Sequence, residues 1–354
     1  MLALFPGCLA PGGIQSSGRL AWEAIVASSR SSLPPFRLCY GDAGPADGPR
    51  PLHEFHTASK YRAVAAAAST RGRFGLVAVW HMDLLKLLPF LRPRGSRVVL
   101  ILQGVEAWRK RPWPERSLLN RVDLFVSISD YTWRRFVGAN PAFAQAPHCT
   151  VPLGIGAPWQ GRIPSPGTPP AALMIGRLAR GEDYKGHRQM LDAWPLVLRK
   201  IPTAELWIAG DGDLRPDLER YAAERGLGQS VRFWGLVSEA HKGRLLEAAH
   251  CLAVPSRGEG FGLVYLEAMR LGRPCLVSTL DAGREVVDPP RNGLAVDPDD
   301  RRSLAEATCR LLASGPEWQQ WSTHARERYE QHFSASHYQQ RLLSTLAGVR
   351  PKRI

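Results

Sequence analysis

The chain has 354 residues, of which 44% are hydrophobic and 22% are charged, an ordinary composition for a globular protein. This length exceeds what one hydrophobic core usually serves, so we expect two domains, and no apolar run approaches the roughly 20 residues that cross a bilayer. The formal net charge is +14, but 39 of the 46 basic residues are arginine, a skew that genomic base composition explains, so basicity alone does not indicate nucleic-acid binding.

Short apolar runs alternate with stretches of helical periodicity along the first half of the chain, which is the pattern of parallel α/β units. The first residues, MLALFPGCLAPGG, lack the basic segment of a signal peptide and are interpreted as a strand and a loop, so we expect a cytoplasmic protein. The expected strands are Leu2–Phe5, Arg37–Tyr40, Leu76–Trp80, Val98–Leu102, Leu124–Ile128 and Thr150–Pro152. The expected helices are Gln15–Arg30, Ala58–Ser69, Asp83–Leu91 and Asp130–Val137.

A proline- and glycine-rich segment without periodicity, GAPWQGRIPSPGTPP at residues 156–170, predicts a linker, and a second α/β series follows it. The expected strands of this series are Ala172–Ile175, Glu205–Ala209, Val231–Phe233, Cys251–Val254, Cys275–Ser278 and Gly293–Val296. Its helices are expected at residues 186–200, 214–226, 239–249, 262–271, 301–313, 316–331 and 335–347.

These elements define an N-terminal domain at residues 1–157, a linker at 158–170 and a C-terminal domain at 171–333. The last segment, 334–354, holds a helix whose apolar positions need a surface, and crossing back to the N-terminal domain is one way to provide it. Parallel α/β sheets bind ligands outside the carboxyl ends of their strands, so we expect the site in a cleft between the domains.

The strongest functional signal is SRGEGFGLVYLEAMRLGRP at residues 256–274, where a buried strand runs into a glycine-rich turn and then a helix. Glycines let the backbone approach a ligand, and the first N–H groups of a helix have no partner within it, which together predict a phosphate site. Glu259 in the turn and Glu267 in the helix are placed to reach opposite ends of one long ligand. A plain helix N-terminus is the alternative for this segment taken alone.

A second signal lies in MIGRLARGEDYKGHRQMLDAW at residues 174–194. A strand ends at Gly176 and Arg177, and Lys185 stands just before the next helix. Two cations at this junction can neutralise a diphosphate, Arg177 through its planar fork and Lys185 as a point charge. The alternative is that both are exposed surface bases, with Asp183 as a candidate ion-pair partner of Lys185.

Together these segments resemble the retaining GT-B glycosyltransferases of family 4, also called glycosyl transferases group 1. GEGFGLVYLEA at residues 258–268 resembles the E-x7-E element of that family, and GRLARGEDYKG at 176–186 is similar to its phosphate clamp. ELWIAGDGDLRPDLE at 205–219 is similar to its strand and G-x-G loop, and residues 231–256 to the segment that lines its base pocket. The order and approximate spacing match across residues 171–299, which is far more specific than any one motif.

The resemblance implies an α/β fold of the GT-B class, with two Rossmann-like domains whose parallel sheets face each other across a cleft. The catalytic residues that it implies are Glu259, Arg177, Lys185 and Gln103. The donor-binding residues that it implies are Gly12, Gly13, Gly212, Val237, Gly260, Phe261, Gly262, Leu263 and Glu267. Gln103 stands where many members carry a histidine, and glutamine cannot act as a general base.

The mechanism that the resemblance implies is mainly electrostatic. The leaving nucleotide diphosphate gains negative charge, which the N–H groups at 261–263 and the two cations Arg177 and Lys185 would stabilise. The departing phosphate then takes the acceptor's proton on the same face of the sugar, so no enzymic base is needed at Gln103. Because two side-chain cations serve where other glycosyltransferases use a metal ion, we expect neither a metal nor another cofactor. The six scattered cysteines form no CxxC pair, which predicts reduced thiols without disulfides or structural zinc.

The N-terminal half is the more basic one, because residues 1–157 carry 19 Lys and Arg against 9 Asp and Glu. MDLLKLLPFLRPR at 82–94 pairs leucines with cations, and WRKRPWPER at 108–116 interleaves tryptophans with them, a mixture that suits contact with an anionic membrane. A core helix and a solvated acceptor loop are the alternatives. The acceptor-side candidates are His81, Trp108 and Arg109.

We therefore expect a bacterial retaining hexosyltransferase that moves a hexose from GDP-mannose or a UDP-sugar to a hydroxyl acceptor. A lipid-linked or polysaccharide precursor is the expected acceptor, and the inner face of the plasma membrane is the hypothesised place of contact. The alternatives are a non-catalytic homologue, an epimerase-like GT-B enzyme and a basic nucleic-acid-binding protein. The last of these lacks any helix-turn-helix, zinc-finger or RNP-type signature, so we expect no nucleic-acid partner.

Overall fold

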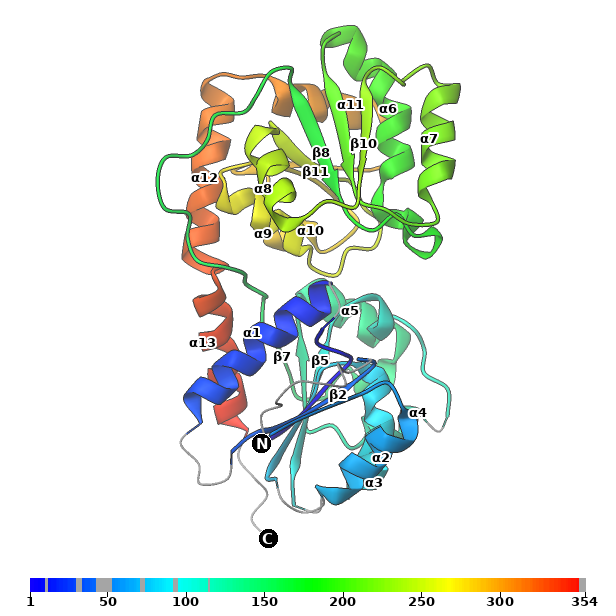
Figure 1. Ribbon diagram of the computed structural model, residues 1–354, viewed down its shortest axis with the longest axis vertical. Coiled ribbons are helices and arrows are strands. Elements are labelled where there is room, and N and C mark those ends of the chain that lie inside the picture. The colour runs from blue at the N-terminus through cyan, green and yellow to red at the C-terminus, as the bar shows by residue number, and fades with distance from the viewer. Residues whose placement is uncertain are drawn as a thin grey trace. The chain divides into compact units, whose positions relative to one another are not determined.

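The computed structural model describes residues 1–9, 12–29, 34–42, 53–70, 74–91, 95–113 and 115–349. The chain forms two compact units (Figure 1). The first comprises Met1–Ile155 together with the C-terminal helix α13 (Ala335–Gly348), and the second comprises Gly156–Ser334. None of the helices within the described ranges is both long and apolar enough to cross a membrane.

The first unit is built on a parallel sheet in the order β3-β2-β1-β4-β5-β6-β7. Its strands are β1 (Leu2–Phe5), β2 (Phe36–Tyr40), β3 (Glu54–Thr57), β4 (Leu76–Val79), β5 (Arg97–Leu102), β6 (Leu124–Ser127) and β7 (His148–Thr150). Strands covered on both faces bury nearly every side chain, and all four residues of β1 are buried. The chain order reverses between β1 and β4, which makes the carboxyl ends of these two strands the switch point of the sheet.

Helices and short 3₁₀ turns connect these strands. They are α1 (Gly13–Ser28), α2 (Lys60–Ser69), η1 (Met82–Leu87), α3 (Leu88–Leu91), η2 (Val105–Ala107), α4 (Glu115–Leu119), α5 (Asp130–Ala139) and η3 (Pro141–Phe143). Helix α13 packs on α1, where the Gln339 side chain donates to the carbonyl of Leu20 at 3.1 Å (Figure 1). The apolar face of the last helix is therefore covered within the first unit.

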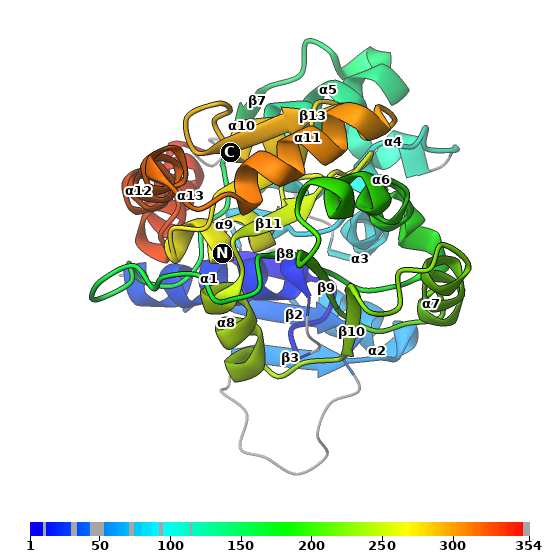
Figure 2. The same ribbon diagram turned by 90° about the horizontal axis from the view of Figure 1, so that it is seen from above.

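The second unit repeats the same plan with the strand order β10-β9-β8-β11-β12-β13. Its strands are β8 (Ala171–Ile175), β9 (Glu205–Ala209), β10 (Val231–Gly235), β11 (Cys251–Val254), β12 (Cys275–Ser278) and β13 (Gly293–Val296). Its helices are η4 (Arg180–Lys185), α6 (His187–Lys200), α7 (Arg215–Glu224), α8 (Glu239–Ala248), α9 (Leu263–Arg270), α10 (Gly283–Val286), α11 (Arg301–Leu312) and α12 (Pro316–His332). Helices α6 and α11 lie side by side (Figure 2). The switch point here falls between β8 and β11.

The sequence analysis missed β3 and several short helical turns, while it placed most other elements within two residues of their observed ends. β3 is an edge strand of four residues, EFHT, with only two of them buried, so it has no apolar run to reveal it. The expected helix at Asp83–Leu91 is a 3₁₀ turn, η1, that continues into the short α3. The two Rossmann-like sheets themselves are confirmed.

Residues 156–170, expected as a linker, run along the second unit and are bound to it by arginine side chains. Arg270 donates to the carbonyl of Ala157 at 2.6 Å, and Arg326 donates to the carbonyls of Trp159 and Gly161 at 3.0 and 2.8 Å. Guanidinium groups therefore supply the hydrogen bonds that an irregular segment cannot make within itself.

Arg273 completes this attachment from a fully buried position. It donates to the carbonyls of Pro164, Leu246 and Glu247 at 2.5, 2.9 and 2.7 Å. Burial lowers the pKa of Arg273 to about 10, so the group remains charged at neutral pH.

We predict that Arg273→Met lowers the free energy of unfolding by about 3 kcal/mol, because the three carbonyls lose their donor and stay buried. Urea denaturation measures the loss. Arg291→Met is the control, since the Arg291 side chain is 72% exposed and should change stability little. Equal stability of the two variants would show that Arg273 does not hold this segment.

Candidate active site

The structure brings the two strongest sequence motifs together at the switch point of the second unit. The chain leaves β8 at Gly176 and leaves its neighbour β11 at Pro255. The N–H of Arg257 donates to the carbonyl of Tyr184 at 2.8 Å, which joins the turn after β11 to η4. Gly186 has a φ of +87°, and a Cβ there would lie 2.4 Å from the carbonyl oxygen of Pro255. Only glycine allows this close approach.

The two cations of the expected phosphate clamp, Lys185 and Arg177, share one partner, Glu182. The Lys185 ammonium lies 2.6 Å from a Glu182 oxygen, and Arg177 pairs with the same carboxylate. Burial raises the pKa of Glu182, but the ammonium and the guanidinium outweigh burial and the net shift is downward. Glu182 is therefore ionised at neutral pH, and an incoming diphosphate would have to replace it on both cations.

Asp183, which the surface-base alternative offered as a partner of Lys185, does not form that ion pair. Asp183 pairs instead with Arg188 at 3.0 Å. On the 3₁₀ turn η4, residues three apart lie on one side and residues two apart do not, so Glu182 is the acidic neighbour that reaches Lys185.

Glu259 occupies the amide-rich turn that the sequence assigns to phosphate. Its carboxylate accepts hydrogen bonds from the backbone N–H groups of Phe261 and Gly260. Burial raises the pKa of Glu259, and the Lys185 ammonium opposes that shift. The turn ends at Gly262, which has a φ of +87° and precedes α9 without a side-chain cap. This part of the chain therefore holds an anionic group at a helix N-terminus, the arrangement that also binds phosphate.

Glu267, one turn before the end of α9, is held by a lysine that the sequence analysis did not single out. Lys242 on α8 donates to one Glu267 oxygen at 2.9 Å and also pairs with Glu239 at 2.9 Å. The other Glu267 oxygen is buried and has no hydrogen-bond partner among the described residues. Burial raises the pKa of Glu267, and Lys242 opposes the shift. The free oxygen can accept a hydrogen bond from a ligand hydroxyl.

The remaining donor-site candidates of this unit follow the strands next to β8. Gly212 lies after β9, where a Cβ would meet the carbonyl oxygen of Leu178 at 2.3 Å. Val237 lies half-buried between β10 and α8. Both are at the carboxyl edge of the sheet, as are Gly176 and Glu259.

The candidates in the first unit lie at the carboxyl edge of its own sheet. Gly12 and Gly13 lead from β1 into α1, and His81 follows β4, so they flank the switch point of that sheet. His81 caps η1, because its Nδ1 accepts the N–H of Asp83 at 3.2 Å, so this histidine has a structural role. Gln103 follows β5; its side chain is buried, and neither its amide oxygen nor its amide nitrogen has a partner among the described residues.

Of the other acceptor-side candidates, Trp108 is packed and Arg109 is exposed. The Trp108 ring meets Tyr131 edge-on at 5.4 Å, and the Arg135 guanidinium lies 5.1 Å above it. Arg109 has its side chain in solvent.

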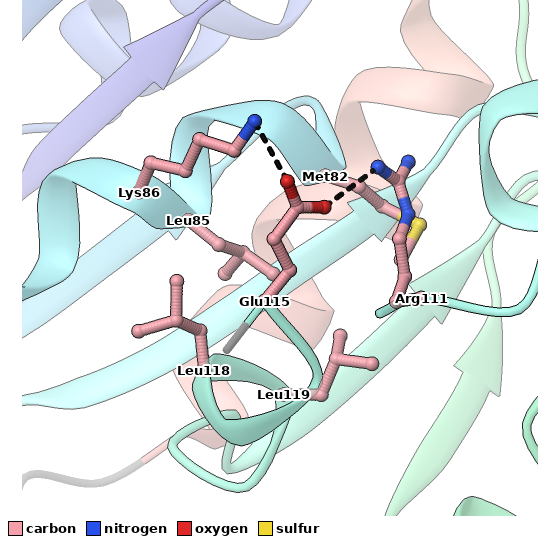
Figure 3. Close-up of a pocket in the computed structure, with 7 residues that line it drawn as sticks. All are labelled: Met82, Leu85, Lys86, Arg111, Glu115, Leu118 and Leu119. Carbon is pink, nitrogen blue, oxygen red and sulfur yellow. Dashed lines mark hydrogen bonds and ion pairs between the residues drawn. The ribbon is translucent and has the colours of Figure 1, made fainter. Parts of the chain in front are cut away.

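Two cations of the basic segments face a carboxylate inside a small pocket (Figure 3). Lys86 and Arg111 lie 2.9 and 3.3 Å from the oxygens of Glu115. The pocket is lined by Met82, Leu85, Lys86, Arg111, Glu115, Leu118 and Leu119. Arg92 and Arg94 of the first basic segment and Pro114 of the second lie outside the described residues.

The sequence analysis also missed a cluster that fixes the loop after β1. The Asp42 carboxylate accepts the N–H groups of Cys8 and Leu9 and lies 2.8 Å from His56 Nδ1. The sulfur atoms of Cys8 and Cys39 lie 2.9 Å apart. Together with an Asp42 oxygen they form a group of three atoms within 4.8 Å of one another, which could hold a metal ion. Because the carboxylate already accepts these hydrogen bonds, it serves here as a clamp on the loop that leads to Gly12.

Solved structures with this architecture are glycosyltransferases of the GT-B fold. Sucrose-phosphate synthase from Thermosynechococcus elongatus is similar with a TM-score of 0.77 at 19% identity, covering 98% of each chain. HepE from Anabaena, in complex with UDP and glucose, has a TM-score of 0.75 at 17% identity and covers 98% of this chain and 99% of that one. The likeness confirms the predicted fold class of two Rossmann-like domains.

Residues 169–314, which lie within the second unit, match the family model described as glycosyl transferases group 1. A GDP-mannose-dependent monoacylated alpha-(1-6)-phosphatidylinositol monomannoside mannosyltransferase from Corynebacterium glutamicum is 30% identical over 245 residues. A phosphatidyl-myo-inositol mannosyltransferase from Mycobacterium leprae is 31% identical over 242 residues. These matches cover 62% and 67% of this chain, but the chain spans only 61% and 58% of the two relatives' lengths.

We predict that Gly262→Ala lowers stability by about 1–3 kcal/mol, because a side chain at a positive φ is strained. A Cβ there would lie 2.3 Å from the Tyr265 ring and 3.2 Å from Glu259 Cγ. Thermal unfolding checks this. Gly243→Ala is the matched control: Gly243 lies within α8 in open space, and alanine there should stabilise the helix by up to about 1 kcal/mol. Equal behaviour of the two variants would contradict the role given to Gly262.

Proposed function

We propose that this protein is a retaining glycosyltransferase that moves a hexose from a nucleotide-diphosphate sugar to a hydroxyl acceptor. The observation that carries the proposal is the convergence of Lys185, Arg177 and the Glu259 turn at the β8–β11 switch point. Two cations suit a diphosphate, and the half-buried Glu259 carboxylate, which the backbone amides of the turn hold in place, suits the hydroxyls of a sugar.

In this proposal the diphosphate replaces Glu182 on Lys185 and Arg177. Negative charge grows on the leaving diphosphate as the glycosidic bond breaks, and these fixed cations stabilise it without reorganising. Removing one such preorganised group typically costs roughly 2.7–4 kcal/mol of barrier. Two cations of the chain carry this charge, and we propose that transfer needs no metal ion.

The two glutamates of the turn and of α9 take different parts of the donor. Glu259 accepts hydrogen bonds from hexose hydroxyls, and the free oxygen of Glu267 accepts one from the ribose. Because Gln103 cannot take a proton as a base, the departing phosphate removes the acceptor's proton on the same face, which retains the configuration of the sugar.

GDP-mannose is the first donor to test, because the Corynebacterium relative is named as GDP-mannose-dependent. UDP-sugars remain the second choice. We propose that the loop between β10 and α8, which contains the half-buried Val237, holds the base through main-chain groups, so that its side chains carry little information about the base.

We predict that one of GDP, UDP or ADP and its sugar raises the melting temperature of the wild-type protein by mass action. Transfer or donor hydrolysis with that sugar is then assayed. Glu267→Gln should weaken nucleotide binding about tenfold, whereas Glu259→Ala should abolish turnover and leave nucleotide binding in place.

Lys185→Met should lower kcat by about 100-fold, as expected for loss of one transition-state cation. Lys200→Met is the matched control, because Lys200 is an exposed lysine in the last turn of α6. Turnover at the wild-type rate in the Glu259 and Lys185 variants would reject the assignment of these residues to the active site. If a nucleotide sugar raises the melting temperature but no sugar is transferred, the epimerase-like or non-catalytic alternatives are supported.

We further propose that the acceptor is lipid-linked and that the first unit meets an anionic membrane surface at the cytoplasmic face. Trp113 is 83% exposed, and the neighbouring Arg109 and Lys110 also face solvent. An exposed tryptophan among cations suits the headgroup region, where its ring settles and arginine meets phosphate.

Liposome co-sedimentation at low salt tests this contact. We expect binding to vesicles that contain anionic lipid, a decrease at high salt because exposed charges are screened, and a several-fold decrease for Trp113→Ala. Tyr61→Ala is the control, since Tyr61 is an exposed aromatic residue of the same unit, at 76%, on α2. Background sedimentation of the wild type would end the membrane proposal and leave the transferase proposal intact.

A further inference from the structure

A buried carboxylate that no sequence motif indicated, Asp281, lies directly behind the Glu259 turn. It belongs to the loop between β12 and α10, and the residue is 5% exposed. One Asp281 oxygen accepts the N–H of Glu259 at 3.1 Å, and the other accepts the N–H of Gly283 at 2.9 Å. The Ser256 hydroxyl bonds to the same carboxylate, and the N–H of Ala282 donates back to the carbonyl of Glu259 at 3.1 Å. The loop after β11 and the loop between β12 and α10 are thus joined by hydrogen bonds to the main chain of Glu259.

The Asp281 carboxylate lies among closely packed groups. A Cβ on Gly283 would lie 3.1 Å from an Asp281 oxygen, 3.2 Å from the Tyr265 hydroxyl and 3.0 Å from Val277 Cβ. Ser256 is itself fully buried and accepts the N–H of Gly258 at 3.0 Å while it bonds to Asp281. The hydrogen bonds of Asp281 therefore extend to the first glycine of the turn.

Placing a second carboxylate beside Glu259 is costly, which argues that Asp281 serves a purpose there. Burial raises the pKa of Asp281 to about 7; the hydrogen bonds from Gly283, Glu259 and Ser256 oppose that shift, and the Glu259 charge adds to it. The Tyr265 hydroxyl on α9 donates to the carbonyl of Val254 at 3.1 Å. Burial and the charges of Asp281, Glu259 and Cys275 all raise its pKa. Lys185 and Glu182 act on Glu259 from η4.

We propose that Asp281 is a positioning residue of the donor site, which holds the turn at residues 256–262 in the conformation that presents Glu259 and its amides to the donor. This inference rests on the proposed function. Asp281 acts through the main chain of Glu259 and does not touch the sugar itself. Its loss should therefore lower kcat more than it changes the KM for the donor.

The protonation state of Asp281 gives the inference a measurable signature. An ionised carboxylate accepts N–H hydrogen bonds more strongly than a neutral carboxyl, so kcat should rise as pH increases through about 7. The free energy of unfolding should change with pH in the opposite direction to kcat. The folded pKa lies above that of an unfolded aspartate, so the stabilising contribution is present below about pH 4 and is lost as pH rises through about 7.

The experiment compares the full-length wild type with Asp281→Asn and with Asp300→Asn as matched control. Asp300 also accepts two backbone N–H groups, those of Arg302 and Ser303 at 3.0 and 3.1 Å, but at the exposed start of α11. We expect Asp281→Asn to lower kcat about tenfold with less than a twofold change in donor KM. It should also remove the acid limb of the kcat profile near pH 7. Asp300→Asn should do neither.

Two measurements do not depend on turnover. Hydrogen exchange of the peptide covering residues 256–262 should be faster in Asp281→Asn than in the wild type and unchanged in Asp300→Asn. The difference in melting temperature, wild type minus Asp281→Asn, should fall as pH rises from 5 to 8. If Asp281→Asn does not fold, Ser256→Ala removes one donor and keeps the carboxylate, and it should show the same changes at smaller amplitude.

The outcomes separate this inference from the function on which it rests. Unchanged exchange in the turn overturns it, and so does faster exchange with wild-type kcat and pH profile, which would make Asp281 a structural clamp only. If the wild type neither binds nor turns over any nucleotide sugar, the proposed function fails, and the positioning role for a donor fails with it. Faster exchange in the turn would then show only that Asp281 orders these residues.

Discussion

The second unit depends most on the position of one ammonium group, that of Lys185. Two glycines make this position available: a Cβ on Gly176 would lie 3.2 Å from Lys185 Nζ, and Gly186 lets the chain turn into α6 against Pro255. From there the ammonium pairs with Glu182, and across the switch point it opposes the burial that raises the pKa of Glu259. The parallel sheet thus brings the loops after β8 and β11 together, and the glycines leave space for the Lys185 ammonium near one carboxylate on each loop.

Each charged group of the site is held by another group of the same chain. Glu182 holds Lys185 and Arg177, the amides after Glu259 hold its carboxylate, and Lys242 holds Glu267. Burying an unpaired charge would cost several kcal/mol, so this pairing is compatible with a stable fold. Under the proposed function it would also make the site selective, because a ligand with its own anionic groups can replace Glu182 on both cations without leaving a charge unpaired.

The sequence predicts those parts of the site that are local in the chain. The strand Cys251–Val254, the turn after it and α9 follow one another, so periodicity and glycines reveal them together. The ion-pair and hydrogen-bond partners of the charged residues cannot be predicted in this way, because most lie far away in the sequence. Lys242 is 25 residues from Glu267, and Asp42 is 34 residues from Cys8, so only the order of strands in the sheet brings them together. Even the ion pair between Glu182 and Lys185, which are three residues apart, cannot be predicted from the sequence alone. Asp183 is an equally good candidate partner unless the segment is known to form a 3₁₀ turn.

Gln103 and Glu267 share a feature that a stable fold alone does not explain. Both amide atoms of Gln103, and one carboxylate oxygen of Glu267, are buried without a hydrogen-bond partner among the described residues. A buried polar atom left unpaired typically costs about 1–3 kcal/mol, and most are paired in folded proteins. Each residue comes after the carboxyl end of a strand in a parallel sheet. Gln103 directly follows β5, and Glu267 lies in α9, the helix after β11. Polar atoms left unpaired at the edge where such sheets bind ligands can hydrogen-bond a hydroxyl-rich ligand, and they differ in this position from unpaired atoms inside the described core such as the indole nitrogen of Trp194.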